Sequence, residues 1–112
     1  MTLGELRTRE NLVGRVFRVH EKSGFAYRGI VDRAEERGDE VVFCLSRHAR
    51  RFEGRDRGSW KNLPDAEIPY GKDLPAEKTV RGIFTVSLPN GSEVYLYPAG
   101  TRLENVENEP LL

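Results

Sequence analysis

The sequence predicts a mainly β domain, a small SH3-like barrel or roll of about six antiparallel strands in two meanders, with a short N-terminal helix. Three observations support this fold class. Segments rich in β-branched and aromatic residues recur along the chain, and clusters of glycine, proline and polar residues separate them. The 112 residues also suffice for one core but not for two, so we expect a single domain over residues 1–112.

The helix is expected within residues 1–12. Thr2 and Glu5 have the spacing of a capping box, in which the threonine caps the first turn and the glutamate reaches back to the cap backbone. We therefore predict a helix over residues 3–11, weakened by Gly4 in its first turn.

The first meander is predicted from three strand-like segments, which are residues 13–20, 25–34 and 40–46. If Lys22-Ser23-Gly24 form the first loop, Arg18 lies directly opposite Arg28. Two opposed cations reduce stability unless an acid or a phosphate lies between them, and Asp32 or an acid from the C-terminal half is the simplest candidate. The third segment contains VVFCL, which is apolar on both faces, so we expect a central strand covered by the helix or by the long loop.

The second meander is predicted over residues 79–88, 92–98 and 101–106. The sequence LPNGS favours a three-residue hairpin loop with Gly91 in the left-handed conformation, which pairs Val86 with Val94. One face is then apolar, and the other is mixed. The mixed face is a candidate contact surface that contains Ile83, Tyr95 and Tyr97. Alternatively, the two tyrosines cover a secondary cluster under the loop at residues 62–78.

Residues 47–78 are expected to form a long loop, basic in its first half and rich in proline in its second. The basic half, residues 47–61, supplies guanidinium and ammonium groups for phosphates and aromatic rings for stacking. Arg18 and Arg28 could extend this surface. The candidate binding residues of the loop are Arg47, Arg50, Arg51, Arg55, Arg57, Trp60 and Lys61. The alternative is an exposed connector whose arginines pair with acids of this chain.

The formal net charge is zero, but the charge is unevenly distributed. Residues 1–61 hold 14 basic and 10 acidic side chains, whereas residues 62–112 hold 4 basic and 8 acidic ones. Neutrality argues against a dedicated nonspecific DNA-binding protein, because phosphate neutralisation supplies most of the affinity of such proteins. A local basic patch is still compatible with a net charge of zero.

The sequence offers little support for catalysis or for metal binding. Two histidines and one cysteine, without CxxC or HxxxH spacing, do not make a zinc site. Cys44 lies in an apolar run, which makes a thiol inert. We therefore expect no catalytic residues, no metal and no cofactor. The low cysteine count, and the absence of a long apolar run or signal-peptide pattern, favour a cytoplasmic protein without a membrane span.

Three functions are compatible with these features. The first is a non-enzymatic interaction module that binds a protein partner or self-associates through the mixed face and the basic loop. The second is a nucleic-acid-binding small barrel that uses residues 47–61. The third is a small-ligand binder or enzyme with a pocket under residues 62–78. Net neutrality places the first slightly ahead of the second.

Overall fold

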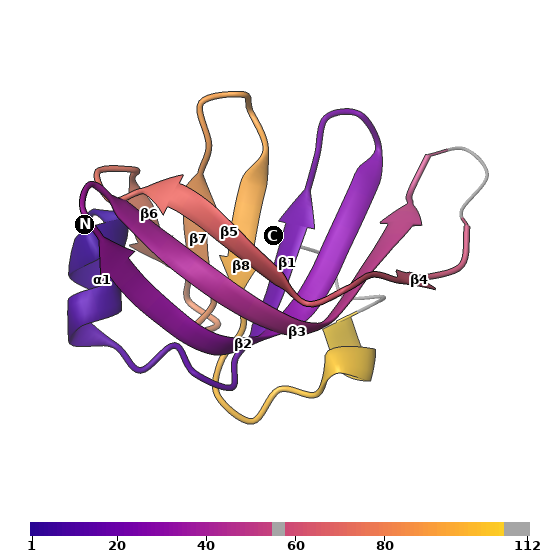
Figure 1. Cartoon of the computed structure of the whole chain (residues 1–112), viewed down its shortest axis with the longest axis horizontal. Helices are drawn as coiled ribbons and strands as arrows, with labels where there is room; N and C mark the ends of the chain where they lie inside the picture. Colours follow the sequence, from indigo (N-terminus) through magenta and orange to yellow (C-terminus); the bar gives the residue numbers. More distant parts are fainter. Residues whose placement is uncertain (55–57, 107–112) are drawn as a thin grey trace.

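A single antiparallel sheet dominates the computed structural model, which describes residues 1–54 and 58–106 (Figure 1). The elements in chain order are α1 (Leu3–Arg9), β1 (Val16–His20), β2 (Phe25–Arg37), β3 (Glu40–Phe52), β4 (Lys61–Asn62), β5 (Ala66–Gly71), β6 (Ala76–Lys78), β7 (Phe84–Ser87), β8 (Glu93–Leu96) and the 3-10 helix η1 (Leu103–Val106). The mainly β class is thus confirmed.

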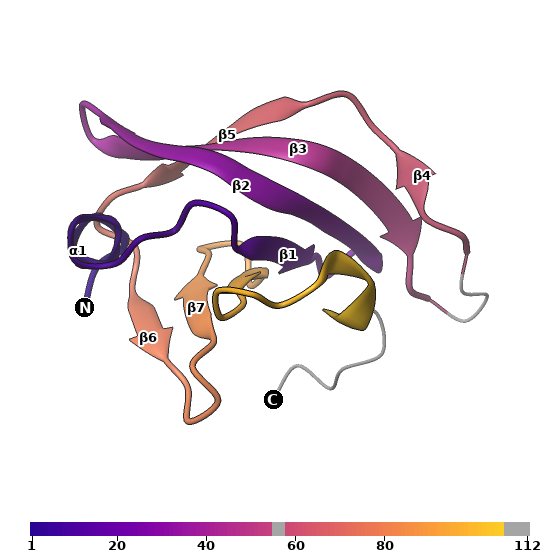
Figure 2. The same ribbon diagram turned by 90° about the horizontal axis from the view of Figure 1, so that it is seen from below.

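The sheet is open, so a closed SH3-like barrel is not confirmed. Its strands follow the order β4-β3-β2-β1-β8-β7-β6, and β5 pairs with the first half of β3. The two ends of this path do not pair with each other. Helix α1 lies at the β6 end of the sheet, far from β4 (Figure 2), and its first residues bond to the β5–β6 connection through Leu3 N to Leu74 O at 2.8 Å and Gly4 N to Lys72 O at 2.9 Å.

Both predicted hairpin registers are confirmed. Arg18 lies opposite Arg28 in β1 and β2, and Val86 lies opposite Val94 in β7 and β8. Gly91 has a φ of 85°, the left-handed conformation that the LPNGS turn requires. These registers follow from loop length, because a slip of one residue would turn every side chain to the other face.

The core lies between the curved sheet and α1. Phe17 and Phe43 are fully buried, with ring centroids 5.6 Å apart, and Tyr70 stacks on Phe17 at 6.4 Å. Leu3 and Leu6 add the apolar side of α1 to the same cluster. The capping box of Thr2 and Glu5 is present, but the helix is shorter than predicted because the chain is extended at residue 10.

The strand at VVFCL is buried on both faces, as predicted. Its core face meets α1 and the other core residues. The second face is not covered by α1 or by a loop, which corrects the expectation. There the long side chain of Arg33 lies over Cys44, and its Nη2 donates to Sγ at 3.5 Å.

The prediction of a long loop over residues 47–78 is wrong, because most of this region is strand. β3 continues to Phe52 instead of ending at residue 46, and β4, β5 and β6 all fall within this region. Bulges between β2 and β3 allow the extension, because an extra residue bends the strand and keeps it paired. Two strands of 13 residues therefore form the long curved ribbon of Figure 2.

Residues 101–106 were predicted as a strand, and the structure places Leu103–Val106 in η1. Leu103 and Val106 are three residues apart, so a 3-10 turn brings them to one side of the helix. That side packs on a second cluster formed with Val16, Ile83 and Tyr97. Among the described residues, no helix is long and apolar enough to cross a membrane.

Leu96→Ala should test the core. Leu96 is fully buried and lies in register with Phe17 and Phe84. We expect the substitution to lower the free energy of unfolding in urea by about 2–5 kcal/mol. Val80→Ala is the control, because Val80 is fully exposed, and it should change that free energy by less than about 0.5 kcal/mol. Equal effects of the two substitutions would contradict this description of the core.

Candidate functional site

The end of β3, the start of β2 and strand β4 lie at the end of the molecule opposite α1 (Figure 1). Side chains alternate between the two faces of these strands. One face carries a group that we call the arginine–tryptophan cluster: Arg18, Arg28, Arg51, Glu53 and Trp60. The other carries the basic aromatic face: Phe25, Arg50, Phe52 and Lys61.

The strand pairing builds the arginine–tryptophan cluster. Arg18 and Arg28 are direct cross-strand partners, and Arg51 lies opposite Ala26, one pair further along the same face. The ring of Trp60 receives all three guanidinium groups. Its centroid lies 4.4 Å from Cζ of Arg28, 4.4 Å from Cζ of Arg51 and 6.0 Å from Cζ of Arg18. Cation–π attraction of this kind is strongest where the cation is desolvated.

Glu53 supplies the acid that the Arg18–Arg28 pair was predicted to need. Its carboxylate accepts hydrogen bonds from Arg18 Nη2 at 2.6 Å and Arg51 Nη2 at 3.1 Å. Burial opposes ionisation of Glu53, but the hydrogen bond from Arg51 and the charge of Arg18 outweigh it and lower the pKa of the carboxyl. The sequence analysis expected this acid to be Asp32 or an acid from the C-terminal half, and the structure corrects that expectation. Asp32 accepts instead from Ser46 at 2.9 Å.

Arg18 is the most deeply buried charged residue of the described chain, at 2 % exposure. Besides Glu53 it donates to the backbone carbonyl of Val106 in η1. Next to it, His20 packs edge-on against Tyr95, with ring centroids 6.1 Å apart. Burial and then the charge of Arg18 lower the pKa of His20, so this imidazole is neutral at pH 7.

The mixed face of the second hairpin is largely covered. Ile83 and Tyr97 are 5 % and 1 % exposed, because they pack under η1 with Val16. A secondary cluster was the alternative for the two tyrosines, but its cover is η1 and not residues 62–78. Tyr95 stays partly exposed and donates its hydroxyl to Glu93 at 2.6 Å. Burial and this hydrogen bond raise the pKa of Tyr95.

The basic aromatic face is exposed. Arg50 and Lys61 are directly opposed across β3 and β4, and both side chains are exposed. Phe52 is 38 % exposed and meets Phe25 edge-on, with ring centroids 5.3 Å apart. The guanidinium of Arg50 lies 5.1 Å from the centroid of the Phe25 ring. Two cations and two aromatic rings thus share one surface, without an acid among these four.

The structure divides the predicted site residues between these surfaces. Arg18, Arg28, Arg51 and Trp60 are brought together in the arginine–tryptophan cluster, and Arg50 and Lys61 belong to the basic aromatic face. Arg47 is exposed and lies at the β2–β3 bulge. Arg55 and Arg57 lie outside the described residues.

Sequence reasoning missed Phe25 and His48. His48 is 8 % exposed and stacks on Tyr27 at 5.9 Å. The alternation of residues 48, 50 and 52 would have placed them on one face if the strand had been extended through the basic stretch. The high arginine content hid that alternation, because it is more typical of a loop.

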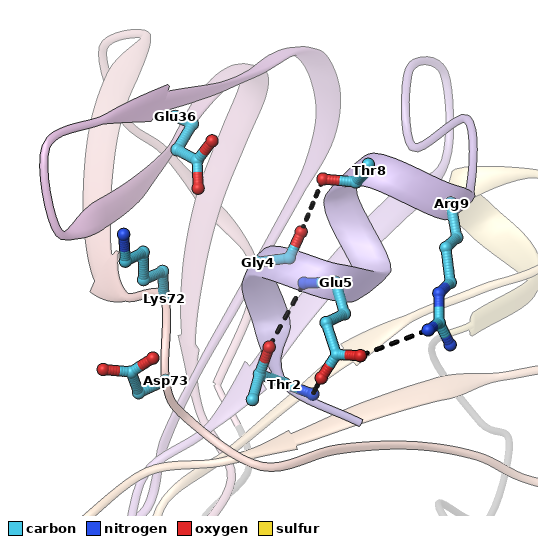
Figure 3. Close-up of a pocket in the computed structure, with 8 residues that line it drawn as sticks. All are labelled: Thr2, Gly4, Glu5, Thr8, Arg9, Glu36, Lys72 and Asp73. Atoms are coloured by element: carbon cyan, nitrogen blue, oxygen red, sulfur yellow. Dashed lines mark hydrogen bonds and ion pairs between the residues drawn. The ribbon is translucent and has the colours of Figure 1, made fainter.

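A hollow of about 410 Å³ beside α1 is a weaker candidate (Figure 3). Several of its charged groups already have partners, and Lys72 pairs with Asp39, outside the lining, at 3.8 Å. Glu5 accepts from the backbone of Thr2 at 3.1 Å and pairs with Arg9 at 3.2 Å, as the dashed lines of Figure 3 mark. No group of three or more metal-ligating side chains occurs within residues 1–54 and 58–106.

No protein-family model, curated protein or solved structure matches this chain.

Glu53→Gln should destabilise the fold. It would leave the buried guanidinium of Arg18 without its carboxylate. Breaking a fully buried pair costs about 3–5 kcal/mol, and we expect about 2–3 kcal/mol here because Glu53 is itself 19 % exposed. Glu35→Gln is the matched control, since Glu35 pairs with Arg33 and Arg37 on the surface and should cost less than about 1 kcal/mol. Equal losses in urea unfolding would contradict the assignment.

The same carboxylate predicts a pH dependence. The pKa of Glu53 is lowered in the folded state, so its contribution is fully present above the ordinary value of 4.5 and is lost as pH falls through the folded value. We expect the free energy of unfolding of the wild type to fall with acidification below about pH 4.5. Glu53→Gln should flatten this dependence. Identical pH profiles for the two proteins would show that Glu53 is not the group involved.

Proposed function

We propose that this protein is a non-enzymatic binding module that holds single-stranded nucleic acid on the basic aromatic face. One observation carries the proposal. Two exposed cations, Arg50 and Lys61, lie there on adjacent strands at the edge of the sheet, next to the exposed ring of Phe52 and the half-buried ring of Phe25. Proteins that bind single strands without sequence preference combine these two elements, in which cations follow the phosphates and aromatic rings stack on bases.

The opposed cations of the β3–β4 ribbon support a polyanionic ligand. Like charges directly opposite each other on neighbouring strands are destabilising. Arg50 and Lys61 are such a pair, and both are exposed to an incoming ligand. A phosphate between them would turn repulsion into two charge-assisted contacts.

The aromatic pair supports a single strand over a duplex. In a duplex the bases are already stacked, and only their edges are accessible in the grooves. Phe52 offers a partly exposed ring, and Phe25 fixes its orientation from the side. Such a ring gains stacking energy from a base that is not already stacked in a helix.

A protein partner on the tyrosine-containing face has less support. That interpretation needs Ile83, Tyr95 and Tyr97 on the surface, and two of them are buried under η1. The overall neutrality of the chain fits a short, local contact with a strand better than a long electrostatic footprint.

Phe52→Ala and the double substitution Arg50→Ala/Lys61→Ala test the proposal. The measurement is fluorescence anisotropy with a labelled single strand of about 10 nucleotides, at several salt concentrations. Phe52→Ala should weaken binding about 5- to 150-fold, the loss of one base stack. The double substitution should also reduce the slope of log affinity against log salt by about 0.7, because the two cations share one phosphate and each phosphate neutralised on a single strand contributes about 0.7.

The matched control is Lys78→Ala/Arg81→Ala. It removes two exposed charges from the β6–β7 end of the sheet, at the far end of the strand order from β4. The control should keep the affinity and nearly the full salt slope. Affinity that does not respond to salt, or that falls equally in the control and in the double variant, would refute the proposal.

A further inference from the structure

A second binding site is suggested by a cavity on the edge of the sheet, where β3 changes partner from β5 to β4. The first six residues of β3 pair with β5, and Ala49 and Arg50 pair with β4. Between them lies a cavity of about 310 Å³, which is at the lower end of the range for small-molecule sites. None of the four residues of the basic aromatic face lines this cavity.

The β-bulge determines which side chains reach this cavity. Ile30 pairs with Ser46 and Arg28 with Ala49, so Gly29 alone faces two residues of β3. Arg47 takes a φ of 51°, and among the described residues it is the one non-glycine with positive φ. Strained backbone of this kind clusters at ligand sites, and bulges redirect side chains there. The result is that Arg28 and Arg47 line the same cavity.

The lining has the composition of an anion site with an apolar wall. Two guanidinium groups and the amide of Asn62 can donate to phosphate oxygens. His48 is 92 % buried, with Nδ1 3.4 Å from the carbonyl oxygen of Pro64, and its Nε2, which has no hydrogen-bond partner within the described parts of the chain, can accept from a ligand hydroxyl. Leu63 and Leu103 give the cavity an apolar side.

We propose that this cavity binds a phosphate monoester that carries a small organic body, of the size of a nucleoside monophosphate. The volume exceeds what a bare phosphate needs, and the leucines offer a surface for a base or another flat group. Asp65, also in the lining, can accept from a hydroxyl and disfavours a ligand with negative charge at that end. The phosphate can belong to a free nucleotide or to the 5′ end of a strand, and only the second source rests on the function proposed above.

Adenosine 5′-monophosphate is the probe, and adenosine is its uncharged counterpart. Titration into the isotope-labelled protein, followed by amide chemical shifts, should move the signals of residues 47–49 and 62–63. Adenosine should bind at least 10-fold more weakly. No shift at these residues, or equal shifts with adenosine, would overturn the proposal.

Arg47→Gly and Asn62→Ala are the test variants. Glycine removes the guanidinium and accepts a φ of 51° without strain, so this variant should fold at least as well as the wild type. Each variant should weaken the monophosphate at least 5-fold. Arg81→Ala is the matched control, because it removes an exposed arginine from the β6–β7 end of the sheet, outside both proposed sites, and should leave this affinity unchanged. Unchanged affinity in Arg47→Gly would also overturn the proposal.

Two oligonucleotides of the same sequence, one with a 5′-phosphate and one with a 5′-hydroxyl, distinguish the two sources of the phosphate. Tighter binding of the phosphorylated strand, lost in Arg47→Gly, supports a strand end as the ligand. Equal binding of the two strands, together with binding of the monophosphate, supports a free nucleotide. Loss of strand binding in Phe52→Ala with monophosphate binding retained shows that the two sites are independent, so failure of one proposal is distinguishable from failure of the other.

Discussion

The buried charge of Arg18 is the constraint around which the second face of the sheet is arranged. A guanidinium that is only 2 % exposed lowers the stability of the fold unless neighbouring groups offset the loss of its hydration. Glu53 at the end of β3, the ring of Trp60 before β4, and the carbonyl of Val106 in η1 all contribute. This one side chain therefore ties together segments of the chain that lie about 35 and 88 residues away in sequence.

That arrangement explains how the described part of the basic stretch, residues 47–54 and 58–61, is held against the sheet. Arg51 and Trp60 belong to the buried face, so they hold β3 and β4 in place. Arg50 and Lys61, one position away along each strand, are thereby turned outward. The same alternation separates Arg51, which packs on Trp60, from Arg50, which faces outward. In the proposed mode of binding, Phe52 stacks on a base and Trp60 supports the surface from the buried face, whereas the sequence analysis counted Trp60 among the candidate binding residues.

Local pairing could be predicted from the sequence, and the connection between the two meanders could not. The LPNGS and KSG turns determined their registers because loop length and glycine conformation are local properties. The extension of β3 through Phe52 depends on bulges and on a partner, β4, that is distant in sequence. The position of α1 likewise depends on residues distant in sequence, since Leu3 N and Gly4 N donate to carbonyl oxygens of the β5–β6 connection. For the site, residue types were predictable, but which arginines lie inside and which outside was not.

The most direct test of the central claim is the map of amide chemical shifts when an unphosphorylated single strand is titrated into the labelled protein. Our account predicts shifts at residues 25–27, 50–52 and 61, on the exposed face of β2, β3 and β4. Shifts confined to β6, β7 and β8, or no shifts at a low salt concentration, would contradict it.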